Sequence, residues 1–91
     1  MAVLAQSIVP GLTREMYDSL ISQFEVKVKQ APGFISHISS EVPGGWMVTE
    51  IWESPEQFYA WVNETVFPAA MAAGMKPPII TITPSHYLIT K

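Results

Sequence analysis

The sequence predicts an α+β fold in which a four-stranded antiparallel sheet carries two helices on one face. Three observations predict it. Segments rich in β-branched residues alternate with segments whose apolar residues recur at helical spacing. A proline-glycine turn joins the two middle strands into a hairpin, which completes the ferredoxin-like order βαββαβ. The length of 91 residues suffices for one domain, residues 1–91, and is too short for two.

Glycine and proline residues divide the first part of the chain. Residues 2–9 are apolar and β-branched enough for a strand, and Pro10-Gly11 closes it. Thr13 is expected to cap the first helix, and the Ala-Pro-Gly segment 31–33 to stop it. The apolar stripe of this helix consists of Tyr17, Leu20, Ile21, Phe24 and Val28. The same signs predict the remaining strands at residues 34–42, 46–53 and 79–90.

The second helix has the clearest start signal. Ser54 is a capping residue, a proline follows it at the first helical position, and Gln57 completes a capping box. The apolar stripe of this helix consists of Phe58, Trp61, Val62 and Val66. Pro68 is expected to interrupt the helix before a further turn that ends at Gly74. Pro84 predicts that the last strand lies at an edge of the sheet or carries a bulge.

The register of the central hairpin decides which side chains share a face. A four-residue turn at the proline-glycine pair sets His37 opposite Glu50. A two-residue glycine-glycine loop sets it opposite Trp52 instead. With either turn, one face, here called the aromatic face, carries Ile35, His37, Trp46, Val48, Glu50 and Trp52. The other face carries Phe34, Ile38, Met47 and Ile51, which we expect the helices to cover as an ordinary core.

The aromatic face would then lie away from both helices. A contiguous apolar surface of this kind marks a contact or a ligand site. We therefore expect a second copy of the chain to pack its sheet against this face and to help enclose a cavity between sheet and helices. We expect a small apolar ligand in this cavity to cover the rest of the aromatic face.

The composition excludes several classes of protein. The chain is 48% hydrophobic and 14% charged, with a net charge of −3. The scarcity of lysine and arginine argues against nucleic-acid binding. No apolar run approaches the ~20 residues of a membrane-spanning helix, and the first residues lack the basic start of a signal peptide, so we expect a cytoplasmic protein without membrane contact. The absence of cysteine excludes disulfides and thiolate chemistry.

Four runs together cover nearly the whole chain: GLTREMYDSL, APGFISH, GGWMVTEIWESPEQFYAWVNETVFPA and PSHY. They resemble the dimeric α/β-barrel superfamily and, within it, small proteins of the antibiotic biosynthesis monooxygenase type. The most specific positions are His37, Gly44, Gly45, Trp46, Trp52, Glu53, Ser54, Phe58 and His86. The resemblance implies a homodimer whose two sheets face each other as a dimeric α/β barrel.

The resemblance implies several activities. Some members oxidise tricyclic phenolic polyketide intermediates with molecular oxygen and no cofactor. Others degrade haem, or isomerise or cyclise small aromatic molecules, because one fold can host many reactions. The haem-degrading branch has an asparagine in its first strand. The first strand of this chain offers only Gln6 as an amide.

His37 is the candidate catalytic base. An imidazole titrates near neutral pH, which suits the removal of a phenolic or benzylic proton. Glu50 would orient the imidazole, as carboxylates do for catalytic histidines. The alternatives are a structural histidine satisfied by Ser39, Glu50 or a backbone carbonyl, and a carboxylate that is simply paired.

Five further residues are candidates for substrate binding: Trp46, Trp52, Trp61, His86 and Tyr87. Tryptophan rings offer flat apolar walls for an aromatic ligand, although they equally fill cores and dimer contacts. His86 would complete the site or contact the second subunit, and a surface position on an edge strand is the alternative. No metal site is expected, because the histidines and carboxylates lack close ligand spacing.

The leading hypothesis is a small homodimeric enzyme that binds a planar aromatic or polyketide-like molecule between tryptophans and helices. His37, assisted by Glu50, removes a proton, and in the oxygenase version the carbanion reduces dioxygen directly without flavin or metal. A cyclase or isomerase would use the same base without oxygen. The remaining alternatives are a non-catalytic module that binds a hydrophobic ligand or haem, and a purely structural dimer contact.

Overall fold

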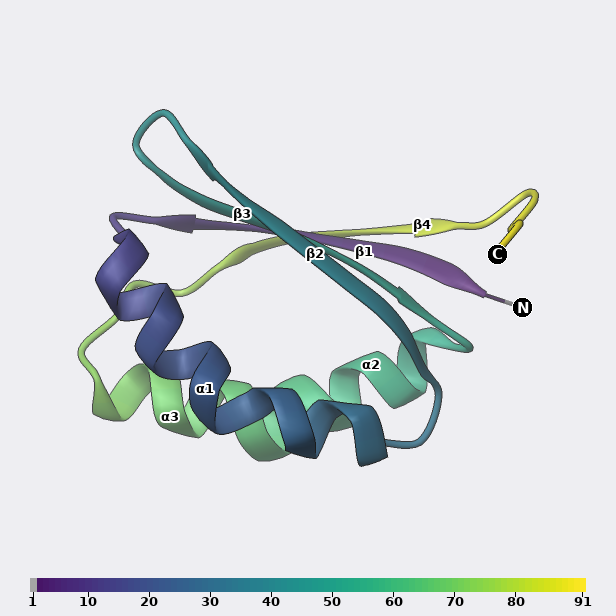
Figure 1. The fold of residues 1–91 in the computed structure, drawn as a ribbon, viewed down its shortest axis with the longest axis horizontal. Helices are drawn as coiled ribbons and strands as arrows, with labels where there is room; N and C mark the ends of the chain where they lie inside the picture. The colour runs from purple at the N-terminus through teal and green to yellow at the C-terminus, as the bar shows by residue number, and fades with distance from the viewer. Residues whose placement is uncertain (1) are drawn as a thin grey trace.

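The computed structural model describes residues 2–91, and its elements follow the predicted order. The strands are β1 (Val3–Pro10), β2 (Phe34–Val42), β3 (Gly45–Trp52) and β4 (Ile79–Pro84). They form one antiparallel sheet in the order β2-β3-β1-β4. The helices are α1 (Arg14–Gln30), α2 (Pro55–Trp61), η1 (Val62–Val66) and α3 (Phe67–Ala72). All of them lie on one side of the sheet, which confirms the ferredoxin-like fold (Figure 1).

The helices begin at the predicted capping residues. Thr13 Oγ1 accepts a hydrogen bond from Met16 N at 3.3 Å and starts α1. Ser54 Oγ accepts a hydrogen bond from Gln57 N at 3.2 Å and starts α2. The Ser54 hydroxyl also donates to Gln57 Oε1 at 2.9 Å, so both side chains of the predicted capping box take part in the helix start.

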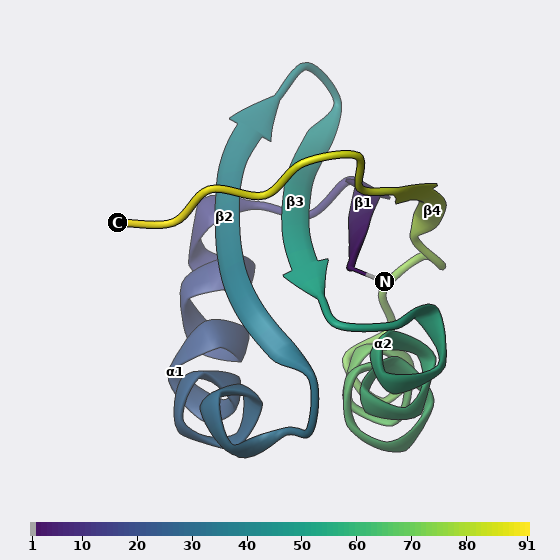
Figure 2. The ribbon, with the colours of Figure 1, turned by 90° about the vertical axis from the view of Figure 1, so that its right-hand side faces the viewer.

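Pro68 does not interrupt the second helical segment as expected. The backbone widens into the π-helix η1 directly before it, where Phe67 N bonds to Val62 O five residues back. Proline has no backbone N–H and cannot donate the regular helical hydrogen bond. The chain stays helical here because the backbone widens by one residue per turn just before Pro68. The segment ends at Gly74, whose φ of 71° favours glycine. Figure 2 shows this segment nearly end-on beside α1.

The hairpin between β2 and β3 has the four-residue turn. Val42 pairs with Gly45 across it, and Gly44 inside the turn has a φ of 80°. His37 therefore lies opposite Glu50, which is one of the two expected registers. The turn thus places an imidazole and a carboxylate side by side on one face of the sheet.

A β-bulge at the start of β2 corrects one expected position. Phe34 pairs with Trp52, whereas Ser36 pairs with Ile51, so Ile35 is the extra residue. Phe34 therefore shares a face with Trp52, and their ring centroids lie 5.4 Å apart in an edge contact. The expectation that Phe34 lies on the opposite face is wrong, because simple alternation along the sequence does not reveal a bulge.

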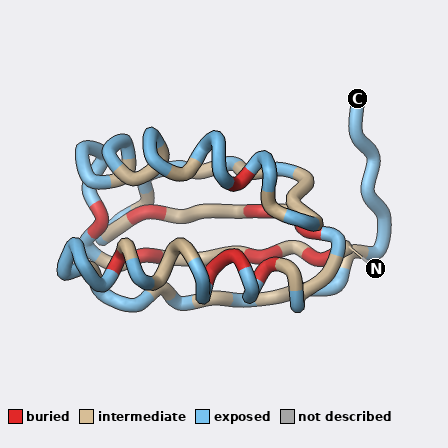
Figure 3. Tube along the Cα trace, turned by 90° about the horizontal axis from the view of Figure 1, so that it is seen from below, coloured by how far each residue is buried: buried red, intermediate tan, exposed pale blue. Residues whose placement is uncertain are grey.

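The helices cover the aromatic face, and the expectation that this face lies away from them is wrong. Trp46, Glu50 and Trp52 are all buried. The larger core cluster joins this face to the helices through Val3, Ala5, Val28, Trp52, Phe58, Trp61 and Val62. Indole rings remove more apolar area from water than aliphatic side chains do, so covering them stabilises the fold most. Viewed from the helix side, α1 and the second helical segment run along opposite sides of the molecule (Figure 3).

The opposite face of the sheet, here called the helix-free face, has no helix over it. Its apolar residues are Leu4, Ile8, Ile38, Met47, Ile51 and Ile79. Ile38 and Ile79 remain 70% and 62% exposed. Three members of this face were expected to form the helix-covered core, so the two faces exchange their expected roles.

The last strand ends at Pro84 instead of residue 90. β4 lies at the sheet edge, in agreement with its proline. Ser85 N donates to Ala2 O at 2.9 Å, and the following residues 86–91 are exposed and leave the body of the molecule (Figure 3). Among the described helices, none is long and apolar enough to cross a bilayer.

Candidate active site

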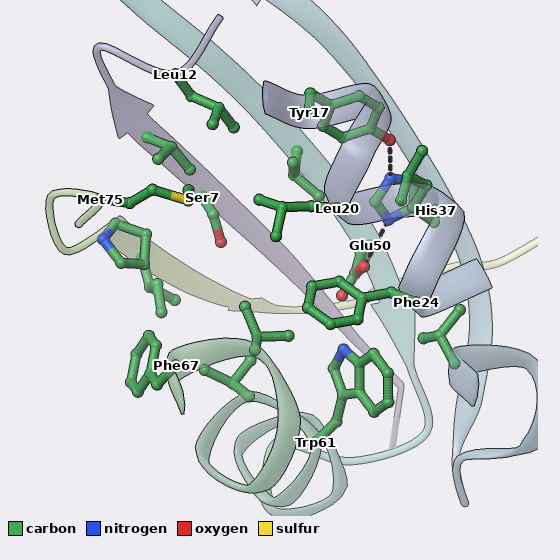
Figure 4. Close-up of a pocket in the computed structure, with 18 of the residues that line it drawn as sticks. Ser7, Leu12, Tyr17, Leu20, Phe24, His37, Glu50, Trp61, Phe67 and Met75 are labelled. Carbon is green, nitrogen blue, oxygen red and sulfur yellow. Dashed lines mark hydrogen bonds and ion pairs between the residues drawn. The ribbon is translucent and has the colours of Figure 1, made fainter. Parts of the chain in front are cut away.

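A cavity of about 120 Å³ lies between the aromatic face and the helices. Its wall is mostly apolar and includes side chains from α1, the second helical segment and all four strands. The polar side chains that line it are Ser7, Tyr17, His37 and Glu50. Few polar groups in an apolar enclosure are typical of a small-molecule site, where they orient the ligand (Figure 4).

Glu50 holds the imidazole of His37 in place. Glu50 Oε2 lies 2.6 Å from His37 Nδ1, and Glu50 Oε1 accepts a hydrogen bond from Trp52 Nε1 at 2.9 Å. Glu50 is only 7% exposed, and both of its oxygens have a partner, as a buried carboxylate requires. Short hydrogen bonds to a carboxylate are among the strongest in proteins, so the ring of His37 has a fixed orientation.

Tyr17 is a third member of this network. The sequence predicts Tyr17 only as part of the apolar stripe of the first helix. Its hydroxyl oxygen lies 2.7 Å from His37 Nε2. Its ring stacks on Trp46, with centroids 4.9 Å apart. The available signal was chemical: a tyrosine at an inward helix position carries a hydroxyl that needs a partner. Figure 4 shows the two hydrogen bonds that connect Tyr17, His37 and Glu50.

The network can carry one direction of donation from end to end. With Glu50 as a carboxylate and His37 as a neutral imidazole, His37 Nδ1–H donates to Glu50, and His37 Nε2 accepts from the Tyr17 hydroxyl. Burial raises the pKa of Tyr17, and the nearby carboxylate of Glu50 adds to the rise. The phenol is therefore protonated at neutral pH. A hydroxyl, an imidazole and a carboxylate in this order can pass a proton from the hydroxyl to the imidazole.

The same residues also reach the outside of the molecule. Tyr17 and His37 line a shallow groove between α1 and β2, as well as the cavity. Each of the two side chains therefore has an apolar cavity on one side and a solvent-open groove on the other. A proton held by His37 can exchange with water at this groove without crossing the cavity.

The three tryptophans lie in three different places. Trp61, on α2, lines the cavity. Trp52 is fully buried at 0% exposure and supports Glu50 from the core instead of lining the cavity. The ring of Trp52 contacts Phe34, Phe58 and Trp61. Trp46 stacks on Tyr17, and its buried Nε1 has no hydrogen-bond partner in residues 2–91.

The remaining candidates lie outside the cavity. His86 and Tyr87 follow β4 and are exposed. Gln6 faces the helix-free face, because its neighbour Ser7 lines the cavity and successive strand residues point opposite ways. Both ring nitrogens of His37 are hydrogen-bonded within the protein, to Tyr17 and to Glu50. Within residues 2–91 there is no group of three or more histidine, cysteine, aspartate or glutamate side chains that could hold a metal ion.

Comparison with known proteins assigns most of the chain to a family. Residues 3–73 match the family described as antibiotic biosynthesis monooxygenase. Among curated proteins, none matches this sequence.

Two solved structures illustrate the range of proteins with this fold. SnoaB, a cofactor-independent oxygenase from Streptomyces nogalater, is 12% identical with a TM-score of 0.69, over 99% of this chain and 97% of SnoaB. The haem-degrader MhuD from Mycobacterium tuberculosis, solved with two haems in its active site, is 22% identical with a TM-score of 0.64. That comparison covers 99% of this chain and 100% of MhuD. At such identities the similarity shows the fold alone.

Proposed function

We propose, since the chain belongs to the antibiotic biosynthesis monooxygenase family, that it is an enzyme acting on a planar aromatic or polyketide-like small molecule. The reaction begins with removal of a proton from an activated CH₂ group of the substrate. In the oxygenation that follows, one CH₂ and one O₂ give one C=O and one H₂O. The substrate supplies all the electrons, so dioxygen is the only co-reactant.

The hydrogen-bonded chain of Tyr17, His37 and Glu50 at the cavity wall is the observation that carries this proposal. The Tyr17 oxygen accepts the substrate proton while its own proton moves to His37 Nε2. The resulting imidazolium lies between the Tyr17 oxygen and the Glu50 carboxylate, which stabilises its positive charge. His37 therefore acts as the base through Tyr17, and Glu50 orients it.

The surroundings of this chain suit a carbanion that must react with oxygen. Val48 and Phe24 belong to an apolar lining that keeps bulk water away from the reacting carbon. His37 returns its proton to the peroxide that forms when the carbanion reacts with dioxygen, so that both hydrogens of the CH₂ group leave in the H₂O. The groove between α1 and β2 lets the proton on His37 exchange with solvent.

A fused-ring substrate needs more room than the cavity offers in this structure. Pockets for drug-sized ligands hold roughly 300–1,000 Å³, against about 120 Å³ here. Leu20 and Met75 line both the cavity and an outer groove between α1 and α3, so they separate the two. Both are unbranched at Cβ, and a change of their rotamers would open the cavity toward this groove.

The homodimer is part of the proposal, with the helix-free face as its contact. This face presents aliphatic side chains to solvent, and Ile38 and Ile79 are mostly exposed. A second copy of the chain would present the same aliphatic face, which is the self-complementarity that a two-fold contact requires. The residues directly after β4 include exposed apolar side chains, Leu88 among them. They would add to the contact with the second copy.

Oxygen uptake tests the proposal most directly. Purified protein free of metal and flavin is mixed in air with a panel of anthrone-like phenols, and oxygen consumption and product mass are measured. We expect uptake with the mass change of CH₂ to C=O, and a loss of at least about 100-fold in His37→Ala, the usual range for a proton-transfer group.

His86→Ala is the matched control, because His86 is exposed and lies outside the cavity lining. It should retain the full rate. A product of unchanged mass without oxygen uptake would instead identify a cyclase or isomerase that uses the same base. Absence of any turnover, with the ligand still bound, would identify a binding protein.

A further inference from the structure

We infer that Ser7 orients the ligand by a hydrogen bond between its hydroxyl and an oxygen atom of the ligand. This inference rests on the proposed function in one respect, namely that the cavity binds an aromatic small molecule. It names an additional property of that molecule, which is a hydroxyl or carbonyl oxygen located away from the carbon that loses its proton.

Ser7 is the polar exception on its face of β1. Val3, Ala5 and Val9 share this face and are all buried and apolar. Ala5 is only 1% exposed, so a small apolar side chain packs well on this strand. Packing alone therefore does not require a hydroxyl at Ser7, since alanine would fill nearly the same volume without a polar atom.

The hydroxyl of Ser7 has no partner within the protein. Ser7 lines the cavity, and Figure 4 shows its oxygen directed into it. No side-chain hydrogen bond joins it to another residue in the described range 2–91. Its oxygen faces a mostly apolar wall, where only water or a ligand can form a hydrogen bond with it. A ligand oxygen would satisfy it, because a hydroxyl both donates and accepts.

The sheet register places Ser7 across the cavity from the proton-accepting chain. Strand β3 lies between β1 and β2. Ser7 on β1 pairs with Val48 of β3, and His37 on β2 pairs with Glu50 of β3. Ser7 and His37 therefore lie two strands apart, roughly 10 Å at the usual interstrand spacing of about 4.8 Å. Ser7 is level with Val48 and His37 with Glu50, so they are also offset by two residues along the strands. The two polar groups therefore lie at diagonally opposite ends of the sheet surface that lines the cavity.

This arrangement selects a class of ligand. A planar aromatic molecule that lies along the floor can place its acidic C–H near Tyr17 and an oxygen near Ser7. A hydrocarbon of the same shape gains nothing at Ser7. A molecule with its only oxygen near the reacting carbon leaves the Ser7 hydroxyl unpaired, which disfavours that orientation.

The test compares two probes that differ by one hydroxyl, 2-naphthol and naphthalene, by calorimetric titration of the full chain. We expect Ser7→Ala to raise the Kd of 2-naphthol about fivefold, as loss of one neutral hydrogen bond does, and to leave the Kd of naphthalene unchanged. Ser7→Thr keeps a hydroxyl and should keep the preference for 2-naphthol. Ser22→Ala, at an exposed serine of α1, is the matched control.

Equal changes in both Kd values, or no change in either, would overturn the role of Ser7. Failure of the unaltered protein to bind either probe would overturn it as well. The readout is binding, so it separates this inference from the proposed reaction. A protein that discriminates the probes through Ser7 but consumes no oxygen would retain the ligand site and lose the oxygenase function.

Discussion

The two faces of the sheet are built on opposite chemistries. The aromatic face contains a histidine, a glutamate and two tryptophans, yet the helices cover it. The helix-free face contains aliphatic residues and threonines, yet no helix lies over it. Ionisable groups can be buried when each polar atom has a partner, as Glu50 has in His37 and Trp52. The apolar part of the helix-free face is aliphatic and needs no specific partner geometry, so a second copy of the chain can cover it.

The largest effect is expected from Trp52→Ala, which removes the centre of the aromatic face. Trp52 is 0% exposed, packs against three other aromatic rings and holds one oxygen of Glu50. We expect the free energy of unfolding in urea to fall by about 3–5 kcal/mol. Tyr59→Ala, at an aromatic residue that is 41% exposed, should cost much less. Equal costs would contradict the central role of Trp52 in the core.

Glu50→Ala should have the next largest effect on stability. It leaves Trp52 Nε1 and His37 Nδ1 without their acceptor inside the protein. An orphaned buried donor costs about 1–3 kcal/mol, measured as a shift in the urea midpoint. Glu53→Ala removes an exposed carboxylate that directly follows β3, the strand of Glu50, and is the control. If both variants unfold alike, the buried network does not stabilise the aromatic face.

Ile38→Lys addresses the helix-free face. Its side chain is 70% exposed in the single chain, so the charge should not unfold the monomer. In a dimer joined through this face, an unpaired ammonium would be buried at the contact. We expect the dimer Kd to rise at least about tenfold, measured by light scattering over a dilution series. Val26→Lys, at an exposed residue of α1, should leave the mass unchanged.

The smallest effect should be the alkaline pH dependence of stability that Tyr17→Phe removes, apart from the hydrogen bond to His37 that this variant loses at every pH. The pKa of Tyr17 is raised in the folded chain, so the folded state retains the phenolic proton when the unfolded chain has begun to lose it. Stability should therefore fall as pH rises above about 10, the ordinary tyrosine value. Urea unfolding between pH 9 and 11 should show a shallower decline for Tyr17→Phe than for the original chain. The same decline in Tyr17→Phe and in the original chain would contradict this expectation.

Much of the candidate site follows from alternation along two strands. The turn chemistry restricts the hairpin to few registers, and one of them pairs His37 with Glu50, as found. Tyr17 was missed as a partner because helical periodicity marks it as apolar, and only its hydroxyl indicates otherwise. Ser7 was not singled out in a strand whose residues are mostly apolar. Both residues reach the site from elements distant in the sequence, which local patterns do not connect.

The sequence by itself determined the order of elements, the helix starts and the hairpin turn, because each depends on capping groups, glycine conformations and periodicity within a few residues. Only the tertiary structure decided which face of the sheet the helices cover. It also decided the bulge at Ile35, the π-helix before Pro68 and the meeting of Tyr17 with His37. Alternation divides a sheet into two faces but does not orient them. The orientation follows from the volume of the indole rings and from the mutual satisfaction of buried polar atoms, and both depend on contacts between distant segments.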